Sequence, residues 1–451
     1  MVYTLIIILL GLSAAAGILR PQLGAVLIWT FAWLYPNSLL YDILPLNIRF
    51  DDLWVVYMFL VCLFLYRHGT GLGRLTWLAI AWWLSIFLGN MTGLLMTGGL
   101  AWQDIIKWIS KSLYVPMTTY VLSCVLDSPR ALEAHLKGLL ISGVLAGALG
   151  IAMVYVPGTF SAFFISRSAH GLLPVEMVEA GEQITRRAQG SVGTNALAAL
   201  SSSLALLALM MAVYQNRTRL RLFCGITCGA LMVALGYTVT RGVIGGVLAA
   251  LLWAVLFTRR RWVLISLIVL GTIVLMWQGG LIERIMLRIV GQPGSPVAPF
   301  WEGLIGRFAI LDMFARNFRI VYVFFGMGMP TVGKLMQATT HNTYLGSFVY
   351  SGVFGAIVLV LVITRGIRLG RGLLRAADDP FSQAIGSFML MLVIALMTYG
   401  VVAENFQAFS AMQIYFAAMV FVEKRLLQVQ AEQEAWLEAY AEQVGQLEPV
   451  A

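Results

Sequence analysis

Long apolar segments separated by short polar ones run through most of this 451-residue chain. Apolar runs of about 18 residues or more are typical of helices that cross a lipid bilayer. The pattern predicts such helices over residues 2–18, 22–36, 52–66, 75–97, 105–126, 136–156, 192–213, 221–238, 242–258, 262–278, 343–363, 382–401 and 405–422. Arg20-Pro21 joins the first two, which are either two helices or one interrupted element, so the count is 12 or 13. We therefore predict an all-α polytopic integral membrane protein.

Residues 279–341 interrupt this pattern with a long polar segment. It carries more basic than acidic residues, namely Arg284, Arg288, Arg307, Arg316, Arg319 and Lys334 against Glu283, Glu302 and Asp312. The segment ends in His341, directly before the chain becomes apolar again. A small basic excess is also typical of a solvated face. Even so, a histidine at the edge of a bilayer makes this segment the first place to look for chemistry.

The C-terminal segment 423–451 differs from the rest in composition. Trp436, Tyr440, Val444 and Leu447 recur at helical spacing, and Glu and Gln fill the other positions. We predict a cytoplasmic amphipathic helix that packs or self-associates. The chain then divides into a transmembrane domain, 1–422, which includes the segments 157–191 and 279–341, and this C-terminal helix.

Basic residues set the predicted orientation. They cluster at Arg67 and Arg74, Arg130 and Lys137, Arg217–Arg221, Arg259–Arg261, Arg365–Arg375 and Lys424-Arg425. An even number of spans separates each cluster from the next, so all can face the cytoplasm, as the positive-inside rule expects. Segments 37–51, 157–191 and 279–341 then lie on the external face, and His68 and His135 lie at the cytoplasmic surface. The side of the N-terminus depends on the span count.

Composition agrees with a membrane protein. The chain is 60% hydrophobic and 11% charged, against about 25% charged residues in soluble domains. Its net charge of +9 is explained by topology rather than by nucleic-acid binding. The first residues carry no basic segment, so the first apolar run is expected to be retained rather than cleaved. The four cysteines lie in apolar runs, which favours packing over metal binding. The absence of a GxxxxGK[ST] sequence argues against an ATP-driven machine.

Two arginine sites are candidates for anion binding. Arg241 lies in Thr240-Arg241-Gly242, on the predicted external side, away from the arginine clusters that set topology. It is either a snorkelling anchor or a functional group. Arg186-Arg187 precede a glycine-rich turn that opens a helix, where free N–H groups and the helix dipole attract anions. Basic residues that flank a span are common, so this second signal is weak alone.

His341 is the candidate general base. Histidine is the side chain best able to accept a proton near neutral pH, although an interfacial histidine with a satisfied hydrogen bond is the commoner case. The external acids Glu176, Glu179 and Glu182 are scattered and form no DxD-type pair. We therefore predict no metal and no cofactor.

Together these sequences resemble the bacterial O-antigen ligase and O-antigen polymerase family of polytopic membrane glycosyltransferases. The similar parts, in order, are Gly190–Asn195 with Ala196-Leu197-Ala198, Thr240-Arg241-Gly242, Phe325-Gly326-Met327-Gly328, His341-Asn342-Thr343-Tyr344-Leu345 and Gly352–Gly355. The similarity covers about 185 to 420, and Thr194 stands where that family often has proline. It implies a GT-C-like membrane fold with 12–13 transmembrane helices and a long helical periplasmic loop.

The resemblance also implies a reaction. Family members move a glycan from undecaprenyl diphosphate to an acceptor hydroxyl at the periplasmic face of the inner membrane, and lipid A–core is the expected acceptor here. Transferred to this chain, His341 is the base. The diphosphate and substrate are bound by Arg186, Arg187, Arg241, Arg307, Asn342 and Tyr344.

Other functions stay open at this stage. An O-antigen polymerase or a protein O-oligosaccharyltransferase would use the same machinery with another acceptor. A polysaccharide or lipid transporter would carry ionisable residues within its spans and inverted repeats, whereas these spans are nearly free of charge. A structural scaffold would leave the external arginines and His341 unexplained.

Overall fold

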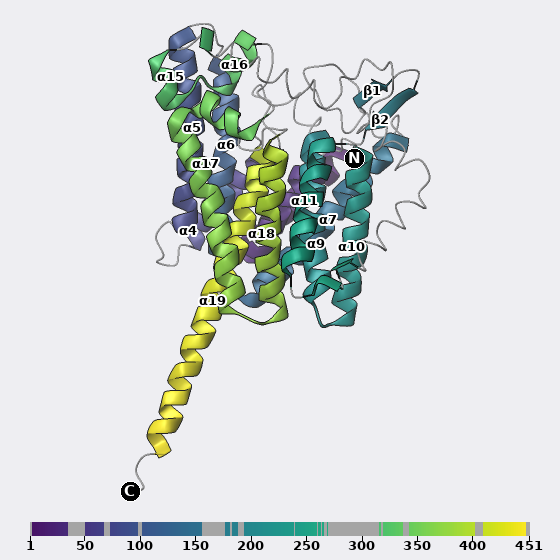
Figure 1. Cartoon of the computed structure of the whole chain (residues 1–451), viewed down its shortest axis with the longest axis vertical. Coiled ribbons are helices and arrows are strands. Elements are labelled where there is room, and N and C mark those ends of the chain that lie inside the picture. The colour runs from purple at the N-terminus through teal and green to yellow at the C-terminus, as the bar shows by residue number, and fades with distance from the viewer. Residues whose placement is uncertain are drawn as a thin grey trace.

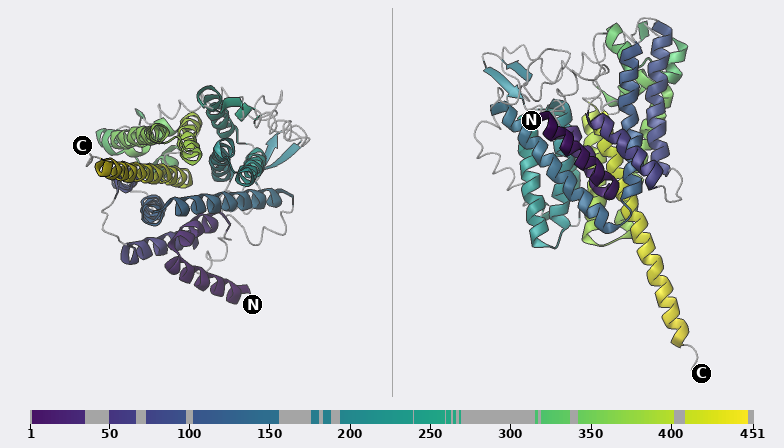
Figure 2. Two further views of the ribbon diagram at one scale, coloured as in Figure 1. Left: turned by 90° about the horizontal axis from the view of Figure 1, so that it is seen from below. Right: turned by 180° about the vertical axis from the view of Figure 1, so that it is seen from behind.

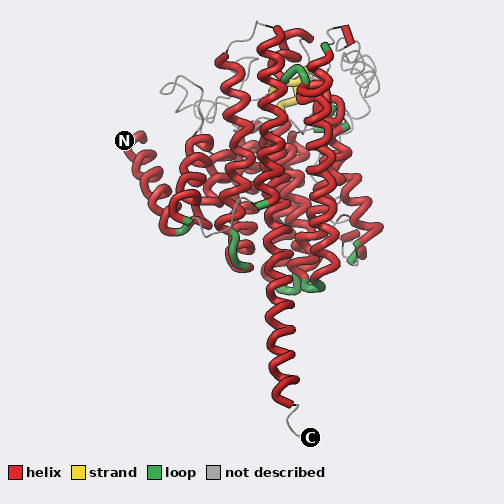
Figure 3. The backbone as a smooth tube through the Cα atoms, turned by 90° about the vertical axis from the view of Figure 1, so that its left-hand side faces the viewer, coloured by secondary structure: helices red, strands yellow, loops and turns green. Residues whose placement is uncertain are grey.

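The computed structural model describes residues 2–34, 50–66, 73–97, 102–155, 176–180, 183–187, 194–238, 240–258, 260–262, 264–265, 268, 315–316, 319–336, 342–401 and 409–447. This part of the chain is a bundle of helices (Figures 1 and 3). Six of its helices are long and apolar enough to cross a membrane, and three shorter apolar helices accompany them. The predicted all-α, multi-pass membrane fold is confirmed.

Most predicted spans coincide with a helix. The helices are α1 (Val2–Leu19), α2 (Pro21–Leu34), α4 (Phe50–Leu65), α5 (Arg74–Thr97), α6 (Trp102–Val125), α7 (Pro129–Tyr155), α9 (Thr194–Tyr214), α10 (Thr218–Thr238), α11 (Arg241–Phe257), α17 (Thr343–Ala376), α18 (Pro380–Gly400) and α19 (Phe409–Leu447). The first two spans are therefore separate helices, divided at Arg20. The predicted span 262–278 lies largely outside the described residues.

The segment 157–191 contains an element that hydropathy did not predict. Strands β1 (Glu176–Ala180) and β2 (Gln183–Arg187) form an antiparallel hairpin, with Glu176 opposite Arg187. Strands this short give no signal in a search for membrane spans. Most of the described part of 279–341 is helical, as expected, with α15 (Ile320–Phe325) and α16 (Met329–Met336) joined by a short turn.

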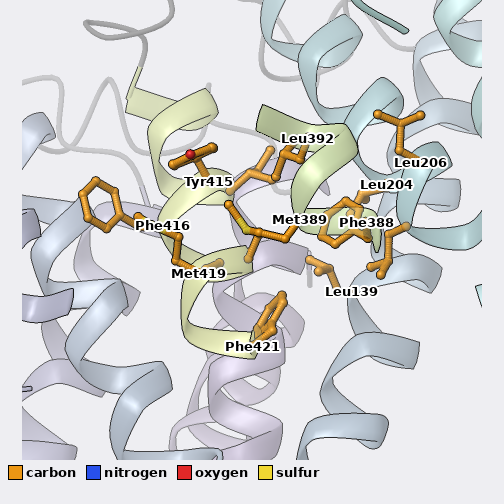
Figure 4. Packing of buried hydrophobic residues seen from close by; sticks show 14 of the residues in the cluster. Leu139, Leu204, Leu206, Phe388, Met389, Leu392, Tyr415, Phe416, Met419 and Phe421 are labelled. Atoms are coloured by element: carbon orange, nitrogen blue, oxygen red, sulfur yellow. The ribbon is translucent and has the colours of Figure 1, made fainter. Parts of the chain in front are cut away.

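The centre of the bundle is α9, almost all of which is buried. A helix that is apolar on every side belongs in the core of a bundle, and α9 packs against α7, α10, α11 and α18. Seen along the bundle, α7 lies between the N-terminal helices and the rest (Figure 2). Figure 4 shows buried side chains where α18 packs against α19. Those of α18 are Phe388, Met389 and Leu392, and those of α19 are Tyr415, Phe416 and Met419.

The bundle has two distinct ends. The C-terminal part of α19 extends from one of them, which we call the tail end; β1, β2, α15 and α16 lie at the other, the hairpin end (Figure 1). The Arg260 guanidinium donates to the carbonyl oxygens of Val213 and Tyr214 at 3.0 and 3.1 Å. This ties the end of α11 to the end of α9 at the tail end. The connection from α17 to α18 lies at this end as well.

His135 is not at the surface, and that expectation is wrong. Its side chain is 1% exposed, and its Nε2 accepts a hydrogen bond from the Trp29 indole at 3.1 Å. Its ring packs against Phe421, with centroids 5.5 Å apart. The reason is that His135 lies on the face of α7 that meets α2 and α19, although it is close in sequence to basic residues.

The last helix, α19, runs unbroken from Phe409 to Leu447. Arg425 fixes it at the tail end, because its guanidinium donates to Ser382 Oγ, Asp379 Oδ2 and Glu432 Oε1 at 2.8, 3.2 and 3.1 Å. Beyond residue 430 the described side chains of α19 are exposed. The predicted C-terminal helix and the described part of the predicted span 405–422 therefore form one continuous helix.

Candidate functional site

The start of α17 is held against the end of α18. Asn342 is the N-cap of α17, and its Oδ1 accepts a hydrogen bond from the Leu345 N–H at 2.9 Å. Asparagine is favoured at this position because its side chain satisfies an N–H that has no partner within the helix. The Asn342 amide also donates to the Val401 carbonyl at 2.9 Å. One side chain thus both starts α17 and joins it to the residue after α18.

Tyr344 makes a second link between these helices. Its hydroxyl donates to the Met397 carbonyl at 2.8 Å. The last carbonyls of a helix lack partners within the helix, so Tyr344 and Asn342 together satisfy two acceptors at the end of α18. The helices approach closely here, since a Cβ on Gly400 would lie 3.1 Å from the Cβ of Thr343. These contacts fix the first residues of α17 against the end of α18.

The start of α11 lies on another side of α18. Thr240 is buried and extended, and α11 begins at Arg241. A Cβ on Gly246 would lie 2.6 Å from the Ala395 carbonyl, so the two backbones are in contact there. The helices run in opposite directions, and five residues of helix rise about 7.5 Å. Arg241 is therefore level with Gly400, at the same end as Asn342.

A glycine-rich turn connects α15 to α16 and packs on α17. Gly326 and Gly328 have φ of 79° and 71°. The N–H groups of Met327 and Gly328 donate to the carbonyls of Val349 and Tyr350 at 2.8 and 3.0 Å. A Cβ on Gly326 would lie 2.2 Å from the Tyr350 carbonyl carbon. Only glycine fits this contact.

The partner of that turn is a break within α17. Gly352 has φ 65° and ψ −163°, a conformation that only glycine adopts readily. A Cβ there would lie 2.4 Å from the Phe324 carbonyl carbon. The break divides α17 into two helical halves. The sequences Phe325–Gly328 and Gly352–Gly355, far apart in the chain, therefore meet in one contact.

Helix α5 completes this contact. A Cβ on Gly89 would lie 2.0 Å from the Tyr350 carbonyl, and one on Gly93 would lie 2.0 Å from the Met327 carbonyl. Asn90 Oδ1 accepts from the Met329 N–H at 3.2 Å. We call the five glycines at 89, 93, 326, 328 and 352 the glycine junction. Sequence reasoning missed its α5 members, although Gly-x-x-x-Gly in an apolar helix is a known signal for close helix contact.

The turn is built for packing rather than for holding a phosphate. A phosphate loop needs N–H groups that point at the ligand. Here the Gly326 N–H donates to the Tyr322 carbonyl at 2.9 Å, and the next three N–H groups are engaged as described above. Any anion at this end of the bundle must be held by side chains or by other backbone groups.

The predicted site residues are only partly placed. Asn342 and Tyr344 are brought together at the end of α18. Arg186 and Arg187 end β2, and Arg241 begins α11, but their side chains lie outside the described part of the chain. His341 and Arg307 lie outside it entirely. Among the residues that the structure describes, no group of three or more His, Cys, Asp or Glu could hold a metal ion.

A groove begins beside this site. It lies between α17, α18 and α19, and its empty volume, mouth included, is about 380 Å³. Its wall is formed by Thr343, Tyr344, Leu359, Val362, Ile363, Val393, Leu396, Met397, Met412 and Tyr415.

No known family profile matches this chain, and comparison with curated proteins gives no match.

Proposed function

We propose that this protein is an O-antigen ligase. In this proposal it transfers a glycan from undecaprenyl diphosphate to a sugar hydroxyl of lipid A–core, in the bacterial inner membrane, with the hairpin end in the periplasm. One observation carries the proposal: the starts of α11 and α17 flank the last turns of α18. Arg241 and Asn342, from sequences that resemble one glycosyltransferase family, thereby lie at the same end of the bundle.

The expected chemistry suits these residue types. A lipid diphosphate leaves as an anion, so the reaction needs positive charge more than it needs a proton donor. Guanidinium groups supply that charge bidentately, and their contacts strengthen as charge develops. In this proposal Arg186, Arg187, Arg241 and Arg307 bind the diphosphate, and no metal or cofactor takes part.

His341 is proposed as the general base that accepts the proton of the attacking hydroxyl. It directly precedes Asn342, whose side chain is fixed by its bonds to Leu345 and Val401. Asn342 and Tyr344 would contact the substrate from positions set by α18. A base must lie within hydrogen-bond reach of its proton, which a firmly anchored helix start favours.

Mutation separates binding from chemistry. Arg241→Ala is expected to abolish transfer and weaken donor binding, and Arg241→Lys to rescue poorly, because a point charge cannot replace a guanidinium fork. His341→Ala is expected to lower turnover by about 10²–10⁴-fold while leaving donor binding largely intact. Arg221→Ala, an exposed arginine at the tail end, is the control. Transfer and lipid diphosphate binding are measured separately on detergent-purified protein. Full activity of Arg241→Lys and His341→Ala would end the proposal.

The acceptor separates the alternatives within the same chemistry. Deletion of the gene for a ligase leaves polymerised glycan on the carrier lipid. Deletion of the gene for a polymerase leaves single repeat units on lipid A–core, and loss of glycan from protein alone would indicate a protein O-oligosaccharyltransferase. A transporter would instead move labelled glycan lipid across liposomes without forming a new glycosidic bond.

A further inference from the structure

Two cysteines from different helices meet between α4 and α6. Along this contact the ring of Phe59 in α4 packs against that of Tyr120 in α6, with centroids 5.3 Å apart. One turn further toward the C-terminal end of each helix lie Cys62 and Cys124, on the same helix faces. Their thiols are hydrogen-bonded to one another. The register of the two helices therefore holds the two sulfur atoms side by side.

The cysteine pair lies near the tail end of the bundle. The charge of Lys424 acts on the Cys124 sulfur, and Lys424 directly precedes Arg425, which binds the start of α18 at that end. Asp127, three residues after Cys124, is exposed. Cys62 is fully buried, whereas Cys124 is partly exposed. A small solute that arrives from the tail end therefore meets Cys124 first.

The neighbours of Cys124 suit a reaction with an oxidant. The thiolate is the form of cysteine that attacks, and a nearby cation or a hydrogen-bond donor stabilises it. Lys424 supplies the cation, and the Tyr120 hydroxyl donates a hydrogen bond to the Cys124 sulfur. Cys62 is placed to react second, because its thiol already contacts that sulfur.

We propose that Cys62 and Cys124 form a reversible disulfide when the protein meets hydrogen peroxide. The Cys124 sulfur attacks one peroxide oxygen and the O–O bond breaks, which leaves a sulfenic acid on Cys124 and releases the other oxygen as water. The Cys62 sulfur then attacks the sulfenic sulfur. The S–S bond forms, the S–O bond breaks, and the second oxygen leaves as water with the proton of Cys62. Both sulfurs are oxidised, and one peroxide is reduced to two waters.

This disulfide ties α4 to α6 near the tail end. In the orientation proposed above, that end faces the cytoplasm, where disulfides are rare and those that form are usually transient, catalytic or redox-sensing. The pair is therefore a redox-sensing modification site rather than a permanent staple. It is independent of glycan transfer, because no residue assigned to the transfer reaction takes part.

The wild-type protein tests the proposal without any substitution. The full chain in nanodiscs is treated with hydrogen peroxide, denatured with N-ethylmaleimide to block the remaining thiols, and mapped by mass spectrometry. The four free thiols should fall by two, with Cys62 and Cys124 in one cross-linked peptide that dithiothreitol separates. Cys224 and Cys228 are the internal control and should stay free. They lie one turn apart on α10, where Cβ atoms are about 5–6 Å apart, beyond the about 3.5–4.5 Å of a disulfide.

Serine variants assign the two steps. In Cys62→Ser, Cys124 should stop at the sulfenic acid, which dimedone traps. In Cys124→Ser, the buried Cys62 should remain a free thiol. The double variant Cys224→Ser/Cys228→Ser should form the disulfide as the wild type does. Gel filtration and melting temperature check that each variant folds, and the wild-type result decides the proposal if a variant does not.

Three results would overturn the proposal. The first is that all four thiols stay free in an excess of peroxide. The second is a disulfide that includes Cys224 or Cys228 in place of the expected pair. The third is sulfinic acid on Cys124 beside a free Cys62, which would show that the second sulfur cannot reach the first.

Discussion

Replacing Gly352 with alanine tests the glycine junction. The native φ of 65° and ψ of −163° lie in a region that costs other residues about 1–3 kcal/mol. The new Cβ would also lie 2.4 Å from the Phe324 carbonyl carbon, and overpacking of this kind typically costs about 1–3 kcal/mol more. We therefore expect Gly352→Ala to lower the free energy of unfolding by about 2–6 kcal/mol.

The assay is SDS titration of purified protein in mixed micelles, followed by circular dichroism. Gly372→Ala is the control in the same helix, because a Cβ there meets only Leu426 at 3.7 Å. Alanine in a helix interior is about 0.5–1 kcal/mol better than glycine, so the control should be neutral or slightly stabilising. Equal stability of the two variants would refute the argument that Gly352 is required by backbone conformation and contact.

Three further predictions concern the site and the tail end. Tyr344→Phe should lower unfolding free energy by about 0.5–1.5 kcal/mol, since it leaves a carbonyl of α18 without its partner; an unchanged melting temperature would contradict this. Burial raises the pKa of Asp379, but hydrogen bonds from Ser382 and the charge of Arg425 outweigh it, so the net pKa is lowered from 3.8. The stabilisation from this lowered pKa is present above about pH 4 and is lost as the pH falls through the folded-state pKa, and Asp379→Asn should flatten the dependence of melting temperature on pH there. Transfer should survive EDTA yet fall at low pH with a midpoint near or below about 6.5, as His341 takes up a proton; a strict requirement for a divalent ion would refute the metal-free mechanism.

The spans could be predicted because each depends on local composition alone. A window of apolar residues is costly to expose to water wherever it lies, so α17 and α18 begin where the sequence predicts. The β1–β2 hairpin could not be found in the same way. Its strands are five residues each, and a polar segment between predicted spans gives no hydropathy contrast to mark them.

Contacts between residues that are far apart in the chain could not be predicted from the sequence. His135 stands among basic residues along the chain, but the Trp29 indole that binds it comes from another helix. In the sequence, Gly89 is one glycine in an apolar run, and only the structure shows that the Tyr350 carbonyl packs against it. For Asn342, the N-cap role is a local property, whereas its bond to Val401 depends on how α17 and α18 pack.

Because α19 is one unbroken helix, the direction in which each side chain of its C-terminal segment points is set by how the helix is oriented within the bundle. An α-helix turns about 100° per residue, and Arg425 fixes the phase near the tail end through three hydrogen bonds. Trp436 and Tyr440, stacked with ring centroids 5.4 Å apart, therefore face a direction determined within the bundle. Inserting one residue near 430 would swing this aromatic pair about a quarter of the way around the axis, whereas inserting seven would nearly restore it. A rotation of α19 within the bundle would therefore also turn this exposed aromatic pair.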